Sequence, residues 1–363
     1  MRRVLWVAIA VALVVLFIMP IFLQNEIVQT IEKSSDMKSH LRVIEAINNG
    51  EEIAVLYYGQ VILAYIMKPI ADSEHIAKFY LWFNFAVLIA SAFSIYYVTK
   101  KLTGKEAALL VIPLAFFCTT GIFALFKYGV IFNIINMYII LPFAIYFAVK
   151  WIDDKKWQYS IPAVMLFALF CSLHYTALYL PYAIGCSLAI YAIYAIAKHK
   201  WGIIMKYIVP CGVGLVALKI LLSINFLGIA GNLPDSTYQL LPIVNFMSLL
   251  LLVDHASIVI AIILFLLVCF FRITYRSVLK ADKRTMILYI ILAGFIVSLF
   301  GGLITLATPD FNRIAIDLAT MMAIAVACIL GGIIRQGKNH AFSKVVVIML
   351  ALGSVPSIIT WVG

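Results

Sequence analysis

Residues 77–105 read "AKFYLWFNFAVLIASAFSIYYVTKKLTGK". After Lys78 the chain continues for about 20 residues without a charge, which is enough for a helix to cross a hydrocarbon core of roughly 30 Å. Lys100 and Lys101 follow directly. Positive charge at the end of an apolar segment is typical of the cytoplasmic side of a membrane protein. The stretch therefore predicts a transmembrane helix near residues 77–99 that ends in an inner loop.

The same pattern recurs along the whole chain, which has 363 residues, 12% charged residues and a mean hydropathy of +1.09. A membrane β-barrel would show shorter segments of alternating polarity. We therefore expect an all-α polytopic membrane protein of about 11 transmembrane helices. These are expected near residues 4–23, 77–99, 106–126, 132–150, 159–173, 175–197, 204–223, 255–271, 285–306, 314–334 and 345–361.

The distribution of basic residues predicts the orientation. Most of the 27 Lys and Arg fall at the N-terminus and in five alternate loops, at 100–105, 150–157, 198–206, 272–284 and 335–344. By the positive-inside rule these loops and the N-terminus are cytoplasmic and the C-terminus is extracytoplasmic. The net charge of +11 is then a topology signal and not a nucleic-acid footprint. Residues 4–23 lack a small-residue cleavage site, so we interpret them as an uncleaved helix in the plasma (inner) membrane.

Two longer segments are left on the outer side, at residues 24–76 and 224–254. We expect residues 1–363 to form a single transmembrane domain with these two extracytoplasmic loops and no soluble domain. The six cysteines all lie within apolar stretches and form no close pair. They are interpreted as core residues, so no metal site is predicted from them.

The first outer loop is predicted to hold two amphipathic helices at the membrane interface. One spans residues 34–50, where a serine caps its start and Gly50 closes it. The other spans about residues 54–68 and is largely apolar. Such helices lie half-sunk at a bilayer surface, and any chemistry is therefore expected on the outer face.

The polar residues of the first of these helices are Asp36, His40 and Arg42. Met37 and Leu41, with Ile44, form an apolar stripe at helical spacing, and Asp36 and His40 are expected on a shared face away from it. One interpretation makes Asp36 a helix-start acid with solvated neighbours. The other makes Asp36 a base that is presented to an acceptor at the lipid surface.

The string Asp36-Met-Lys-Ser-His40-Leu-Arg42, with Gly50 eight residues later, is similar to the D-x-x-x-H-x-R…G pattern of archaeal oligosaccharyltransferase catalytic subunits. Together with the long first outer loop and the many spans, the chain resembles the GT-C superfamily of polyprenyl-phosphate-dependent glycosyltransferases. The resemblance implies a GT-C fold and a catalytic role for Asp36, as a base or as part of a metal site.

Two departures from the oligosaccharyltransferase pattern narrow this implication. The chain has no WWDYG-like acceptor motif, and "FKYGVIFN" at residues 126–133 lacks the acidic pair that those enzymes use for a metal. The first departure argues against an oligosaccharyltransferase. The second favours a metal-independent enzyme with no cofactor, with a divalent metal as the alternative.

A lipid-phosphate donor requires cationic or hydrogen-bonding groups for its phosphate. Arg313 is the first candidate, because "TPDFNRIAIDL" at residues 308–318 predicts a helix that begins at the outer surface. Lys219 and His174, each near an outer helix end, are the next candidates, and His40 and Arg42 complete the predicted donor- and substrate-binding set. The alternatives are an interfacial anchor for Arg313, a snorkelling side chain for Lys219 and an isolated histidine for His174.

The predicted reaction is transfer of a hexose or pentose from a polyprenyl-phosphate donor to a glycan or lipid-linked acceptor hydroxyl, with inversion at the anomeric carbon. The expected partners are the donor, the acceptor and membrane lipids, without nucleic acid, and the oligomeric state is left open. One rival is an O-antigen-type polymerase or ligase, although residues 224–254 lack the Lys and Arg that such an enzyme concentrates in a late outer loop. A transporter or flippase, which predicts internal repeats and broken helices, is the other.

Overall fold

The computed structural model describes residues 24–33, 35–51, 58–70, 73–116, 131–173, 180–197, 201–203, 283–305 and 311–335, together with isolated positions elsewhere. The described part of the chain is almost entirely helical and contains no strand. This agrees with the prediction of an all-α protein. The predicted spans near 255–271 and 345–361 and the second outer loop, residues 224–254, lie outside the described residues, as do those near 4–23 and 204–223 apart from isolated positions.

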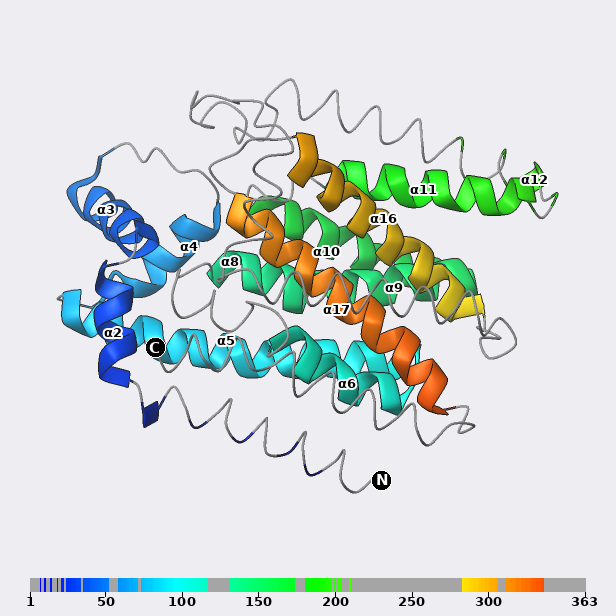
Figure 1. Cartoon of the computed structure of the whole chain (residues 1–363). Helices are drawn as coiled ribbons and strands as arrows, with labels where there is room; N and C mark the ends of the chain where they lie inside the picture. Colours follow the sequence, from blue (N-terminus) through cyan, green and yellow to red (C-terminus); the bar gives the residue numbers. More distant parts are fainter. Residues whose placement is uncertain are drawn as a thin grey trace.

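Three short helices lie at one end of the molecule (Figure 1). They are α2 (Gln24–Lys33), α3 (Ser35–Asn49) and α4 (Tyr58–Met67). The helix α2 was not predicted, because residues 24–33 were assigned to a loop. Its Ile27 and Ile31 are four residues apart and both are buried, so the helix docks through one narrow apolar stripe.

The remaining elements form a bundle, in which successive long helical stretches run in opposite directions and α8, η2 and α9 count as one stretch (Figure 1). In chain order they are α5 (Ser73–Leu102), α6 (Lys105–Phe116), α8 (Ile131–Ile134) with the π-helix η2 (Ile135–Ile140) and α9 (Leu141–Asp154), the 3-10 turn η3 (Trp157–Tyr159), α10 (Ser160–Leu173), α11 (Leu180–Ala197), the short α12 (Trp201–Ile203), α16 (Lys283–Thr305) and α17 (Phe311–Arg335). They overlap the predicted segments from 77–99 to 175–197 and near 285–306 and 314–334, of which residues 117–126 and 175–179 lie outside the described residues.

Two of these helical stretches are long and apolar enough to cross a membrane, namely His75–Leu102 and Ile131–Asp154. Shorter apolar helices lie at Trp157–Phe170, Ala183–Ala197, Met286–Ser298 and Thr320–Gly331. Large apolar side chains such as Trp82, Phe93 and Met165 are exposed on the outside of the bundle. A few asparagine, serine and threonine side chains are buried inside it, within a core that is mainly apolar.

The tight turns of the bundle lie at the end opposite α2, α3 and α4 (Figure 1). Gly104, at a φ of 119°, connects α5 to α6, and Lys155, at a φ of 56°, ends α9 in the left-handed conformation. The start of α16 and the end of α17 lie at this same end. The described parts of the predicted basic inner loops are therefore collected at one end of the bundle.

Small residues allow the closest helix contacts. A Cβ atom at Gly331 of α17 would lie 2.4 Å from the Cα of Ala107 in α6, and one at Gly294 of α16 would lie 2.5 Å from the backbone nitrogen of Ser187 in α11. Both distances are well below van der Waals contact. The backbones of these two helix pairs therefore touch, as is common where helices associate in lipid.

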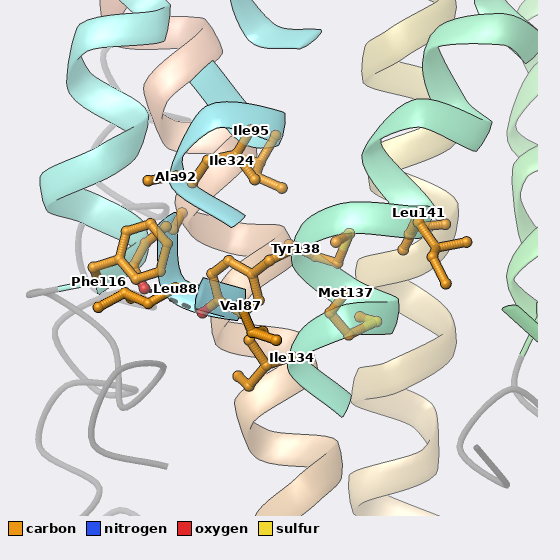
Figure 2. Packing of buried hydrophobic residues seen from close by; sticks show 14 of the residues in the cluster. Val87, Leu88, Ala92, Ile95, Phe116, Ile134, Met137, Tyr138, Leu141 and Ile324 are labelled. Carbon is orange, nitrogen blue, oxygen red and sulfur yellow. Dashed lines mark hydrogen bonds between the residues drawn. The ribbon is translucent and has the colours of Figure 1, made fainter. Parts of the chain in front are cut away.

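The core of the bundle is continuous from α5 and α6 through η2 to α17. Figure 2 shows Tyr138 of η2 pointing toward Phe116 of α6, with Ile134 and Val87 nearby. The rings of Phe116 and Tyr138 are stacked at a centroid distance of 5.2 Å. This core fixes α17 against α6 and η2 and so places the start of α17 near the three short helices (Figure 1).

Candidate functional site

Helix α3 places Asp36 at its second position, within the first turn. The helix ends in a Schellman motif, in which the N–H of Gly50 donates to Ile47 and the N–H of Glu51 donates to Ala46. Gly50 has a φ of 69°, which favours glycine at this position. The predicted closure of this helix by Gly50 is confirmed.

The predicted position of His40 on a face away from the apolar stripe is wrong. Its side chain is 1% exposed, and its ring centroid lies 5.8 Å from that of Tyr80 in α5 and 6.1 Å from that of Phe132 in α8. Val43 and Ile44 are buried on the same side of the helix. The reason for the error is that α3 packs against the bundle through this side, so the imidazole is enclosed by aromatic rings instead of headgroups.

The opposite side of α3 carries Lys38, Arg42 and Glu45, all of which are exposed. Arg42 therefore lies away from the contact that His40 makes with α5 and α8. The structure brings His40, but not Arg42, into the junction between the short helices and the bundle.

Helix α4 meets the bundle beside the same aromatic residues. A Cβ atom at Gly59 would lie 2.6 Å from the ring of Phe132 and 2.6 Å from the backbone oxygen of Leu173 in α10. The absence of a side chain at Gly59 thus lets α4 lie directly on α8 and α10. Phe132 is therefore held between His40 of α3 and Gly59 of α4.

Arg313 is the third residue of α17, and this helix begins at the same end of the bundle as α3 and α4 (Figure 1). One turn further along α17, Asp317 is 1% exposed. Thr320, three residues later, donates a hydrogen bond of 2.8 Å to the hydroxyl of Tyr138. That hydroxyl in turn donates to the backbone oxygen of Ala115 at 3.1 Å. A chain of hydrogen bonds therefore connects α17, η2 and α6 below Asp317.

Sequence reasoning did not single out the amides of Asn84, Asn133 and Asn136, although each interrupts an apolar run. All three side chains are 0% exposed. Asn136 lies in the π-helix η2 and donates to the backbone oxygen of Phe170 in α10 at 3.1 Å. Polar side chains at such positions in apolar helices are costly to bury and are frequently functional.

The opposite end of the bundle carries a separate ionic cluster. Arg284 of α16 donates to the carboxylates of Asp153 and Asp154 at the end of α9, the latter at 2.8 Å, and Lys150 donates to Asp154 at 3.3 Å. The hydrogen bonds to Asp153 and Asp154 raise the pKa of Arg284 above its ordinary value. The cluster joins α9 to α16 far from α3, so we interpret it as structural.

The remaining predicted ligands, His174 and Lys219, lie outside the described residues, and Asp36 and Arg313 are placed by their backbones alone. Within the part of the chain that the structure describes, no three His, Cys, Asp or Glu side chains are close enough to hold a metal ion. Metal dependence therefore stays a prediction. No family model, curated protein or solved structure was found to match the chain.

Proposed function

We propose that this protein is an integral membrane glycosyltransferase with a GT-C-like fold. It transfers a sugar from a polyprenyl-phosphate donor to the hydroxyl of a glycan or lipid-linked acceptor on the extracytoplasmic face. Asp36 is the base, and Arg313 binds the donor phosphate.

The observation that carries the proposal is the convergence of two separate parts of the chain at one end of the bundle. Helix α3 begins there with Asp36 in its first turn, and α17 begins there with Arg313 in its first turn (Figure 1). The two residues are far apart in the sequence, and the resemblance of residues 36–50 to a glycosyltransferase motif did not depend on Arg313. The N-terminus of a helix presents backbone N–H groups and the positive end of the helix dipole, which together suit a phosphate.

The membrane assignment is supported by two helical stretches that are long and apolar enough to cross a bilayer, His75–Leu102 and Ile131–Asp154. Large apolar side chains such as Trp82 and Phe93 are exposed, which is stable where the surroundings are lipid. The described basic turns lie at the end opposite α3, so under the positive-inside rule the end that holds α3 and the start of α17 is extracytoplasmic.

The proposed reaction is a single displacement. The acceptor oxygen forms a bond to the anomeric carbon while the bond between that carbon and the phosphate oxygen breaks. The acceptor proton passes to the carboxylate of Asp36, and the electron pair of the broken bond leaves with the polyprenyl phosphate, whose charge Arg313 stabilises. Because no enzyme group attacks the anomeric carbon, the configuration there is inverted.

Within this proposal His40 is a positioning residue. Its ring is packed between α5 and α8, and it lies one turn after Asp36 on α3. The contact fixes the first turn of α3 relative to the bundle, and hence fixes the backbone of Asp36 relative to the start of α17. Gly59 contributes to the same fixation by letting α4 lie on Phe132.

The phosphate site is tested by measuring the affinity of the detergent-purified protein for decaprenyl phosphate. Loss of a charged hydrogen-bond donor, in Arg313→Gln, is expected to weaken binding about 10- to 100-fold. Arg335→Gln is the matched control, because Arg335 is the last residue of the same helix and lies at the opposite end of the bundle. Equal affinities for the two variants would contradict a phosphate site at the start of α17.

A further inference from the structure

The side chain of Asn133 has an unusual environment. It belongs to α8, it is 0% exposed, and neither its amide nitrogen nor its amide oxygen has a hydrogen-bond partner among the described residues. An amide that is buried without partners destabilises the fold, and such groups are rare in native proteins. Asn133 therefore calls for an explanation other than stability.

Asn136 shows what a structural asparagine looks like in the same segment. It lies one turn further along and is equally buried, and its amide nitrogen donates to the backbone oxygen of Phe170 in α10 at 3.1 Å, although its amide oxygen, like that of Asn133, has no partner among the described residues. Polar side chains that connect helices in this way contribute to helix association in lipid. Asn133 makes no such contact, although both residues stand at the junction between α8 and η2.

The amide of Asn133 indicates the kind of group that it recognises. An amide can both donate and accept hydrogen bonds, and the hydroxyl groups of a sugar do the same. The π-helix η2 begins two residues after Asn133, and interruptions of this kind are frequent at functional sites.

We infer that Asn133 is a specificity-determining residue that hydrogen-bonds a hydroxyl of the transferred sugar. The inference rests on the proposed function, and it names the part of the donor that Asn133 contacts. Arg313 holds the phosphate, and Asn133 distinguishes a donor that carries the correct sugar from bare polyprenyl phosphate. Because Asn133 is 0% exposed and α3 and α4 pack on Phe132, a sugar reaches the amide only if these contacts open when the donor binds.

The test compares wild type, Asn133→Leu and Asn136→Leu, and uses two probes, namely bare decaprenyl phosphate and decaprenyl phosphate that carries a single hexose or pentose from a panel. For Asn133→Leu we expect the affinity for the best sugar-bearing lipid to fall about tenfold or more. It should then equal the affinity for the bare lipid, which we expect to be the same in the variant and in the wild type. Its unfolding midpoint without added lipid stays at or above the wild-type value, since no hydrogen bond is lost. Asn136→Leu, which loses the bond to Phe170, unfolds at a lower temperature.

Two results would overturn the inference while leaving the proposed function intact. One is an Asn133→Leu protein that keeps the wild-type preference for the sugar-bearing lipid, with Asn133→Ala as the second variant if the leucine variant does not fold. The other is an unfolding midpoint for Asn133→Leu that falls as far as that of Asn136→Leu, which would make Asn133 a structural residue. A wild-type protein that binds neither probe would refute the proposed function and the inference together.

Discussion

Replacement of Gly331 by alanine tests the packing on which the placement of α17 depends. The new Cβ atom would lie 2.4 Å from both the Cα and the backbone nitrogen of Ala107, whereas carbon atoms in contact are about 3.5–4.0 Å apart. Because both clashing atoms belong to the backbone of α6, no side-chain rotation relieves the overlap. Helices α6 and α17 must therefore move apart by about 1 Å. This separation removes a quarter to a half of the dispersion energy of the contacts between the two helices.

The size of the effect follows from two opposing contributions. Overpacking of a core costs about 1–3 kcal/mol, and a clash with backbone atoms is expected near the upper limit. Alanine in place of glycine within a helix returns about 1 kcal/mol. The net loss in the free energy of unfolding is therefore about 2 kcal/mol. The shift in the unfolding midpoint is this loss divided by the unfolding entropy of the chain. With the entropy per residue that is typical of globular proteins and 363 residues, the unfolding midpoint falls by about 3 °C.

The assay is thermal unfolding of the detergent-purified protein, with Gly202→Ala as the matched control. A Cβ atom at Gly202 of α12 would meet nothing within 4 Å, so this variant is expected to unfold at or slightly above the wild-type temperature. A midpoint for Gly331→Ala that equals the control would refute the argument, because it would mean that the backbones of α6 and α17 do not touch at this position.

Three further predictions concern the other contacts of the bundle. Tyr138→Phe keeps the stacked ring but removes the hydrogen bond to Ala115 and the acceptor of the hydrogen bond from Thr320. The free energy of unfolding should therefore fall by about 1–3 kcal/mol. An unchanged unfolding midpoint would contradict these hydrogen bonds. Arg284→Gln should lower the midpoint by an amount equivalent to about 1 kcal/mol at low salt, and the difference should shrink in 1 M salt; a difference that is independent of salt would argue against an ionic contribution. His40→Ala removes two aromatic contacts and should weaken the docking of α3 by about 1–3 kcal/mol. The measurement is amide hydrogen exchange within α3, which should become faster. Unchanged exchange would show that the imidazole does not hold α3 against the bundle.

The long helices could be predicted from hydropathy because each is a continuous apolar run that ends in charges. The segment predicted near 77–99 lies within α5, and Lys100 and Lys101 lie in the last turn of that helix. The helix that contains Asp36 could also be predicted, since a serine precedes its first turn and Gly50 supplies a left-handed φ at its end. These features depend on residues that are close in sequence, so the sequence alone carries them.

The features that were missed depend on contacts between distant residues. The helix α2 is too polar to register in hydropathy, although the spacing of Ile27 and Ile31 could have revealed it. Nothing within residues 34–50 shows that His40 meets Tyr80 and Phe132 instead of lipid headgroups, because those rings belong to helices about 40 and 90 residues away.

The asparagines of the α8–η2 segment illustrate the same limit. The sequence shows two amides three residues apart in an apolar run, and both are buried. Only the fold distinguishes them, because the partner of Asn136 is a backbone oxygen of α10, 34 residues away. A residue whose role depends on whether a distant helix supplies a partner cannot be assigned from local pattern.

The central claim is that Asp36 is the base of a sugar transfer, and the most direct measurement is transfer itself. Purified protein in nanodiscs is given radiolabelled polyprenyl-phosphate sugars and membrane-extracted acceptors, and wild type is compared with Asp36→Asn. Glu45→Gln serves as the control, because Glu45 is an exposed acid of the same helix. We expect Asp36→Asn to bind donor but transfer no sugar, and Glu45→Gln to transfer at the wild-type rate. Transfer that survives in Asp36→Asn would show that Asp36 is not the base and leave it as a helix-start acid.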